Sequence, residues 1–215
     1  MFYKFKIKIL KILNYVLNKL NLSLDTCIES NKIDKIINKL KPHDLGYTLI
    51  RVGSANDGGY LIPDILNEID YCFSPGVGNK TDFEKHLVDK EIKTFLADGT
   101  IQKDNIDLSK FDFLNQNIAS YNSKNTITLQ KWISNKIEKN SNLLLQMDVE
   151  SSEYEVISST PEETLNMFKV MIIEFHYLEK LNNNLIYELF YNIIKKIMIN
   201  FEVAHIHPNN CNGTF

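Results

Sequence analysis

Short apolar runs alternate with amphipathic segments along most of this chain, and this alternation limits its folds more than any other feature. The apolar runs have the length of strands, and the stretches between them have helical spacing. Strands that alternate with helices form βαβ units, whose right-handed crossovers build a mostly parallel sheet. We therefore predict an α/β fold, with strands at residues 71–74, 93–96, 143–147, 170–173 and 201–206 and helices at residues 82–89, 130–138, 152–158 and 186–199.

Turn-forming residues add further short elements. The stretch SANDGG separates two short apolar runs, at residues 48–52 and 60–62, and its Asn, Asp and Gly content is typical of a hairpin. Strands at residues 118–120 and 126–129 are expected on either side of a turn at 122–125. We place an N-terminal helical extension at residues 1–48 and the compact domain at residues 49–215.

Charge and cysteine content exclude several classes of protein. The chain has 215 residues, a formal net charge of −3 and a pI near 6.0, so it lacks the overall basic character of a nucleic-acid-binding protein. Its three cysteines, Cys27, Cys72 and Cys211, are widely spaced and form no CxxC pair. They indicate neither a disulfide framework nor a cysteine zinc site, and a reducing cytoplasm suits them.

The first 24 residues are basic and amphipathic. They carry five lysines and no acidic residue, and the lysines interrupt every apolar stretch. This pattern argues against a transmembrane helix and against a signal peptide. A basic amphipathic helix can lie on an anionic membrane surface. The simpler expectation is a helix packed on the domain or on a partner subunit.

Polar and charged residues follow the predicted strands. The run LLLQM leads directly into Asp148 and Glu150, although the glutamates that follow also suit the first turn of a helix capped by Ser151 or Ser152. Because the carboxyl ends of parallel strands meet at one edge, where such sheets bind ligands, residues from distant parts of the chain should collect there. They are Gly76, Gly78, Asp98, Asp148, Glu150, Glu174, His176, His205 and His207.

The glycine turn and the next acid indicate a cofactor containing adenosine. SPGVG lies between a strand and a helix, and Asp98 ends the following strand, where an acid can bind ribose hydroxyls. A nicotinamide-dependent oxidoreductase would need GxGxxG, but Gly78 is followed by Asn79, Lys80 and Thr81. A methyltransferase that uses S-adenosylmethionine is the better match.

The segment from residue 49 to 215 resembles the FkbM-like methyltransferases, a class I family that uses S-adenosylmethionine. The resemblance rests on RVGSANDGGYLIPD, SPGVGNKTDFE, LADGT, QMDVESSEYEVI, IIEFHYLE and HIHPNN, in that order. It implies a Rossmann-like sheet with helices on both faces. Ser151 departs from the family pattern, which commonly has glycine there, and Ser74 stands where many class I methyltransferases have an acid.

The resemblance also implies roles for individual residues. Gly76, Val77 and Gly78 would pass under the cofactor, Asp98 would bind its ribose, and Asp148 would lie near the transferred methyl group. The remaining cofactor residues that we expect, as walls of the site, are Asp57, Tyr60 and Glu84. The acceptor implied is a hydroxyl of a sugar, a glycan or another small metabolite.

Methyl transfer to a hydroxyl requires a base. His176 is our first choice, because histidine titrates near neutrality and this one follows a strand end beside Glu174; His205 is the second.

Two other functions stay open at this point. Six residues, Asp148, Glu150, Glu174, His176, His205 and His207, are of the types that hold a divalent cation, in a metal-assisted methyltransferase or a metal-dependent hydrolase. No close pair such as HExxH supports a metal, so we do not favour it. The domain could also be a non-catalytic module with a methyltransferase fold.

The C-terminus gives a final expectation. Class I methyltransferases end with a sixth strand and an antiparallel seventh that inserts beside it. Residues 201–206 would be the sixth strand, and the sequence then has no room for a seventh before Phe215. We expect either a truncated product with reduced stability and activity, or a short form in which the sixth strand pairs directly with the fifth or a partner supplies the missing strand.

Overall fold

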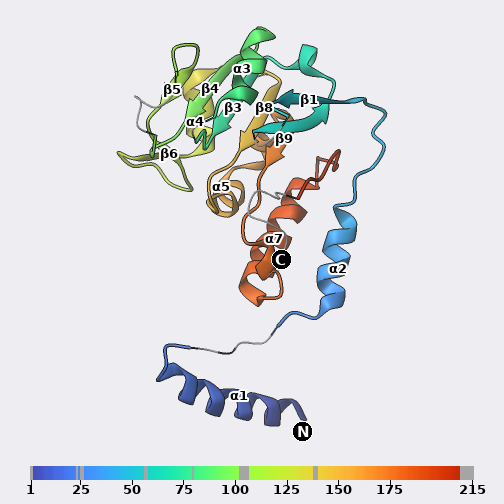
Figure 1. Ribbon diagram of the computed structural model, residues 1–215, viewed down its shortest axis with the longest axis vertical. Coiled ribbons are helices and arrows are strands. Elements are labelled where there is room, and N and C mark those ends of the chain that lie inside the picture. Colours follow the sequence, from blue (N-terminus) through green and yellow to red (C-terminus); the bar gives the residue numbers. More distant parts are fainter. Residues whose placement is uncertain are drawn as a thin grey trace.

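The computed structural model describes residues 2–22, 24, 27–55, 58–78, 80–101, 107–137 and 140–208. Five parallel strands form the central sheet: β3 (Tyr71–Pro75), β4 (Lys93–Ala97), β5 (Asp112–Leu114), β8 (Leu143–Met147) and β9 (Phe168–Ile173). They lie in the order β5-β4-β3-β8-β9 (Figure 1). The predicted α/β fold with a parallel sheet is therefore confirmed.

Helices lie between these strands along the chain and after β9. They are α3 (Asp82–Asp89), α4 (Leu129–Lys136), α5 (Glu153–Ser159), α6 (Glu162–Leu165) and α7 (Asn184–Ile197), together with the short 3-10 helices η1 (Leu66–Glu68) and η3 (Leu178–Lys180). The Thr128 side chain caps α4 by accepting a hydrogen bond from the backbone N–H of Lys131, and Asn183 caps α7 in the same way.

The two faces of the sheet build two separate apolar layers. Along β8, Leu143, Leu145 and Met147 pack with Trp132 of α4 and with helices α5 and α7, while Leu144 faces the opposite layer with Phe83 of α3. Successive strand residues point to opposite faces, so a strand covered on both sides must be apolar throughout. This explains the unbroken LLL of the sequence, and all five residues of β8 are buried.

A separate antiparallel hairpin covers part of the second face. It consists of β1 (Leu49–Gly53) and β2 (Gly59–Pro63), which pair as the turn-rich SANDGG predicts. Val52 and Ile62 are fully buried and belong to the same apolar cluster as α3. A second small ladder, formed by β6 (Asn117–Ile118) and β7 (Thr126–Ile127), is parallel.

The N-terminal region contains two helices with different surroundings. Helix α2 (Ser30–Lys39) packs on the domain: Ile36 is buried in the same cluster as Phe190 of α7, and Tyr187 donates a hydrogen bond to the carbonyl of Lys32. Helix α1 (Phe2–Asn18) lies apart from the sheet and its helices (Figure 1). The boundary between residues 48 and 49 stays a prediction, although the contacts of α2 join it to the domain.

One predicted strand was wrong, and one strand of the sheet was not predicted. Residues 201–206 form no strand: the backbone N–H of His43 donates to the carbonyl of Val203, and residues 205–208 are exposed. Within the described residues, β9 is therefore the last strand of the sheet. Conversely, β5 was missed, because its three residues, DFL, begin with an aspartate and are too short to stand out as an apolar run.

Candidate functional site

The register of the sheet brings the predicted residues together in pairs. Pro75 of β3 is opposite Ala97 of β4, so the next residues, Gly76 and Asp98, leave the sheet side by side. In the same way Met147 of β8 is opposite Ile173 of β9, which places Asp148 beside Glu174. The strand ends thus gather the glycine turn and three acids at one edge, as expected for a parallel sheet.

Gly76 occupies a position where only glycine fits. Its φ is +82°, and a Cβ built there would lie 1.5 Å from the backbone oxygen of Asp148. The turn after β3 therefore passes directly over the end of β8. Gly78 also has a positive φ, of +58°, but the space around it is open. This agrees with a backbone turn that approaches a ligand closely.

Asp98 anchors this turn. Its Oδ2 accepts hydrogen bonds from the backbone N–H groups of Val77 (3.1 Å) and Gly78 (3.4 Å). Its Oδ1 accepts from the backbone N–H of Thr100 and from the Thr100 hydroxyl. Asp98 is buried, at 6% exposed, and these four hydrogen bonds fix the shape of the glycine turn. A role in binding ribose stays a prediction.

A cavity of about 270 Å³ lies between the glycine turn, the hairpin and α3. Six of the predicted site residues line it: Tyr60, Gly76, Val77, Gly78, Glu84 and Asp148. The structure therefore collects most of the predicted cofactor residues around one space. Asp57 lies outside the described residues, but the adjacent Gly58 is part of the lining.

A buried polar network forms one wall of this cavity. Ser74 Oγ lies 2.6 Å from both Glu84 Oε1 and Gln146 Oε1, and Gln146 Nε2 donates to the Tyr60 hydroxyl. Burial raises the pKa of Glu84. One hydroxyl proton cannot serve two acceptors, and a protonated Glu84 donating to Ser74 would satisfy all three groups. Glu84 thus brings a carboxyl group from α3 next to Ser74, where many class I methyltransferases have an acid.

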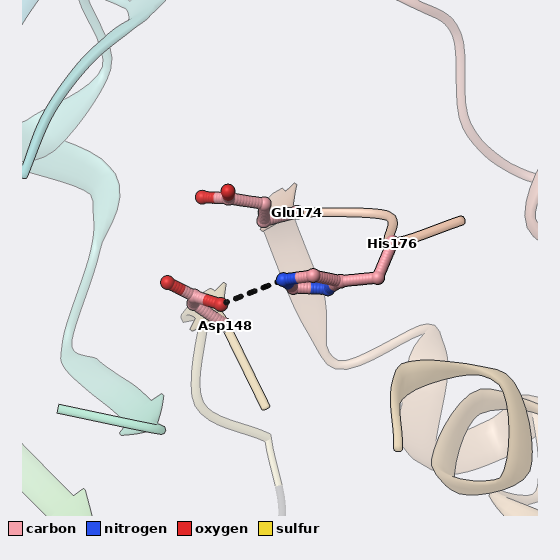
Figure 2. Close-up of side chains that lie close together, drawn as sticks. All are labelled: Asp148, Glu174 and His176. Atoms are coloured by element: carbon pink, nitrogen blue, oxygen red, sulfur yellow. Dashed lines mark ion pairs between the residues drawn. The ribbon is translucent and has the colours of Figure 1, made fainter. Parts of the chain in front are cut away.

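Asp148, Glu174 and His176 form a compact cluster at the ends of β8 and β9. Figure 2 shows the His176 imidazole turned toward Asp148, with Glu174 beside them. His176 Nε2 lies 3.7 Å from Asp148 Oδ1, a buried oxygen with no hydrogen-bond donor among the described residues. Burial, and then the nearby Glu174 carboxylate, raises the pKa of Asp148 to about 6.

Glu153 holds His176 in place from the first turn of α5. Its Oε1 accepts a hydrogen bond from the backbone N–H of His176 (2.8 Å) and lies 3.2 Å from Nδ1 of the same residue. The Glu153 side chain is fully buried. With the Nδ1 proton held by Glu153, Nε2 is the nitrogen left to act as an acceptor.

The charges around His176 also shift its pKa. Burial lowers the pKa of His176. The carboxylates of Glu153, Asp148 and Glu150 raise it by a larger amount, so the net pKa is above its usual value.

The loop between Asp148 and α5 has unusual backbone geometry. Glu150 and Ser151 both have positive φ, of 50° and 79°, although neither is glycine. The left-handed region disfavours residues with a Cβ. Ser151 therefore stands at a position where the family commonly has glycine and where the backbone conformation also favours glycine.

The other predicted histidine is elsewhere. His205 is exposed, and its ring stacks on His207 with centroids 6.3 Å apart. Burial, the charge of His207 and that of Arg51 lower the pKa of His205. Among the described residues, neither His205 nor His207 joins the cluster of Asp148, Glu174 and His176. Glu150 Oε2 lies 3.4 Å from His176 Nε2, but the Glu150 side chain is 88% exposed.

Among the predicted metal-binding residues, only Asp148, Glu174 and His176 form a group that could hold a cation within the described ranges. One atom from each lies within 4.8 Å of the others. Two carboxylates and an imidazole suit a divalent cation, and Glu153 would orient the imidazole as a carboxylate often does at metal sites. The donor set therefore fits a metal as well as a proton-transfer site.

Sequence reasoning missed Glu153 and Gln146 as site residues. Glu153 was placed in the first turn of a helix, where acids are common, and its link to His176 depends on folding. Gln146 could have been found, because it is the one polar residue in the buried run LLLQM. An isolated polar group in a buried strand must find a partner.

One comparison with known protein families gave a match. The family model described as the methyltransferase FkbM domain matches residues 28–204. Because this match covers most of the chain, the chain belongs to the FkbM methyltransferase family. No curated protein and no solved structure gave a significant match.

Proposed function

We propose that this protein is an S-adenosylmethionine-dependent O-methyltransferase that uses His176 as its base. One observation carries the proposal: Asp148 lines the cavity beside the glycine turn, and its Oδ1 lies 3.7 Å from His176 Nε2. The Asp148 carboxylate thus lies between the cavity proposed for the cofactor and the nitrogen proposed to accept the proton. The family match supports a methyltransferase in general.

The lining of the cavity suits a cationic cofactor. When bound, S-adenosylmethionine supplies a methyl group on a positively charged sulfur. Asp148 offers a partly buried carboxylate, whose Oδ1 has no hydrogen-bond donor among the described residues. Asp98 stabilises the turn that would approach the ribose.

The cluster on β8 and β9 suits an acceptor hydroxyl. The hydroxyl oxygen forms a bond to the methyl carbon as the carbon–sulfur bond breaks, and its proton passes to His176 Nε2. Glu153 fixes the imidazole orientation and stabilises the imidazolium that results. A positioned base of this kind contributes roughly 10²–10⁴-fold to the rate. A hydroxyl of a sugar, glycan or small metabolite is the proposed acceptor class.

A panel of hydroxylated acceptors, assayed by transfer of radiolabelled methyl groups, tests this proposal. Once an acceptor is found, His176→Ala should lower kcat by about 10²–10⁴-fold and leave affinity for S-adenosylhomocysteine within about twofold, because the imidazole acts on the acceptor. His43→Ala is the matched control, since His43 is exposed. Wild-type turnover in His176→Ala would remove His176 from the mechanism.

The cluster of Asp148, Glu174 and His176 favours one second candidate, in which a divalent cation binds there and orients the acceptor or activates water for hydrolysis. The two candidates differ in their response to chelation. Dialysis against EDTA should leave methyl transfer unchanged if His176 is the base. Loss of activity that Mg²⁺ or Mn²⁺ restores would establish the metal-assisted reaction instead.

A further inference from the structure

Helix α1 carries an apolar stripe that nothing in the described structure covers. Each member has another member three or four residues away, so they lie on one face of the helix. Each is between 44% and 62% exposed: Phe5, Ile9, Ile12, Leu13 and Val16. A stripe of this kind needs an apolar partner, since ordinary surface helices turn such a face toward the core.

Three lysines, Lys8, Lys11 and Lys19, lie on a face of the helix beside the stripe. Lys8 and Lys11 are three residues apart, and the next positions on the same face are Tyr15 and Lys19, whose ammonium lies 5.3 Å from the Tyr15 ring centroid. Residues 1–24 contain five lysines and no acid. The partner must therefore combine an apolar interior with negative charge.

We propose that α1 binds the surface of an anionic lipid bilayer, with the stripe in the acyl region and the lysines at the headgroups. Helices of this type lie in the interface plane and bind through apolar burial together with attraction to anionic lipids. None of the described helices has the length and apolar character needed to cross a bilayer, so α1 would lie on the membrane surface. This proposal is independent of the methyl-transfer chemistry.

A second copy of α1 is a poorer partner. The spacing of the stripe also fits a coiled-coil seam, but α1 has only 17 residues, about two heptads, and sustained seams need roughly three or four. Two copies would also bring lysines against lysines without any acid to pair with them. An anionic lipid surface has neither disadvantage.

The connection to the domain allows this placement. Cys27 forms an isolated bridge to Asn183, and the backbone N–H of Ile28 donates to the carbonyl of Asn182, so the chain is fixed to the domain from about residue 27. Asn14 exchanges hydrogen bonds with the backbone of Leu24, which holds the chain against α1 as far as that residue, and the three residues from Leu24 to Cys27 can span up to about 10 Å. Helix α1 can therefore lie flat on a surface without displacing α2 from α7.

Flotation of the full chain with vesicles tests the proposal. We expect binding to vesicles of phosphatidylglycerol and phosphatidylcholine in equal parts, and much weaker binding to phosphatidylcholine alone. The double variant K8Q/K11Q should lose about 25-fold in affinity for the anionic vesicles, at about fivefold for each lysine. High salt should weaken binding of the unmodified chain, because it screens the lysines.

A matched pair of isoleucines tests the stripe itself. Ile9→Ser removes a member of the stripe and should weaken vesicle binding about tenfold. Ile7→Ser makes the same change two positions away, near the opposite side of the helix, and should weaken it less than about threefold. Equal losses in the two variants would overturn the orientation proposed here.

Two further results would overturn the proposal as a whole. One is the absence of binding to anionic vesicles by a chain that is folded by circular dichroism. The other is a dimer, detected by sedimentation velocity, that Ile9→Ser dissociates while vesicles do not bind; a second copy would then be the partner of α1.

Discussion

Replacing Ser151 by glycine should stabilise the protein. Ser151 has a φ of 79°, in the left-handed region, at the loop that carries Asp148 into α5. Placing a residue with a Cβ in that region costs about 1–2 kcal/mol. Glycine avoids this cost but loses about 0.5–1 kcal/mol through the greater freedom of the unfolded chain. The net gain expected for Ser151→Gly is therefore about 0.5–1 kcal/mol.

The adjacent serine is the control. Ser152 has an ordinary φ of −75°, so Ser152→Gly relieves no strain and should destabilise the protein by about 0.5–1 kcal/mol. For a chain of this size 1 kcal/mol corresponds to about 2–4 °C in Tm, so the two variants should shift Tm in opposite directions by a few degrees. Thermal and urea unfolding of both would measure the difference. A fall in Tm for Ser151→Gly comparable to that for Ser152→Gly would refute the argument from backbone strain.

Three further predictions concern the site. Glu153→Gln should move the acidic limb of the pH–rate profile to lower pH, because the Glu153 carboxylate helps to raise the pKa of His176 and the base must be neutral to act; an unmoved limb would mean that His176 is not the group that titrates. The pKa of Asp148 is raised from 3.8 to about 6. Between pH 3.8 and about pH 6 the folded protein therefore binds more protons at this carboxyl than the unfolded chain does, and the free energy of unfolding falls as pH rises through this range. Asp148→Asn should therefore raise Tm more at pH 8 than at pH 4, and an equal effect at both would contradict the shift. Asp98→Ala should weaken S-adenosylhomocysteine binding by about 1–3 kcal/mol, because it leaves the N–H groups of the glycine turn without their acceptor. Asp89→Ala, at an exposed position, is the control. Unchanged affinity in a folded Asp98→Ala protein would rule out a role for Asp98 in cofactor binding.

The strands that could be predicted are those whose residues are apolar because both faces of the sheet are covered. β8 has the predicted bounds, since LLLQM is buried along its whole length. β5 escaped prediction because a three-residue edge strand needs little apolar surface. Residues 201–206 have apolar residues at strand-like spacing, but a strand forms only where a ladder is available, and this segment hydrogen-bonds to His43 instead.

The membership of the site was easier to predict than its contacts. Strand ends place Asp148 and Glu174 at one edge whatever the details of packing, and the register then sets them side by side. The support of His176 by Glu153 depends on how α5 packs against the end of β9, which no local pattern specifies. His205 was the second candidate base because it also ends a predicted strand, yet its ring stacks on His207 and it does not join the Asp148 cluster among the described residues.

Calorimetry with S-adenosylhomocysteine tests the central claim most directly, because it needs no knowledge of the acceptor. We predict binding of one ligand per chain, competed by S-adenosylmethionine. Binding should be lost in Gly76→Ala, whose added Cβ would overlap the backbone of Asp148 and force the glycine turn out of position. His43→Ala, at an exposed position, should bind as the unmodified chain does. A folded, unmodified chain that releases no heat with millimolar ligand and shows no rise in Tm would contradict the account.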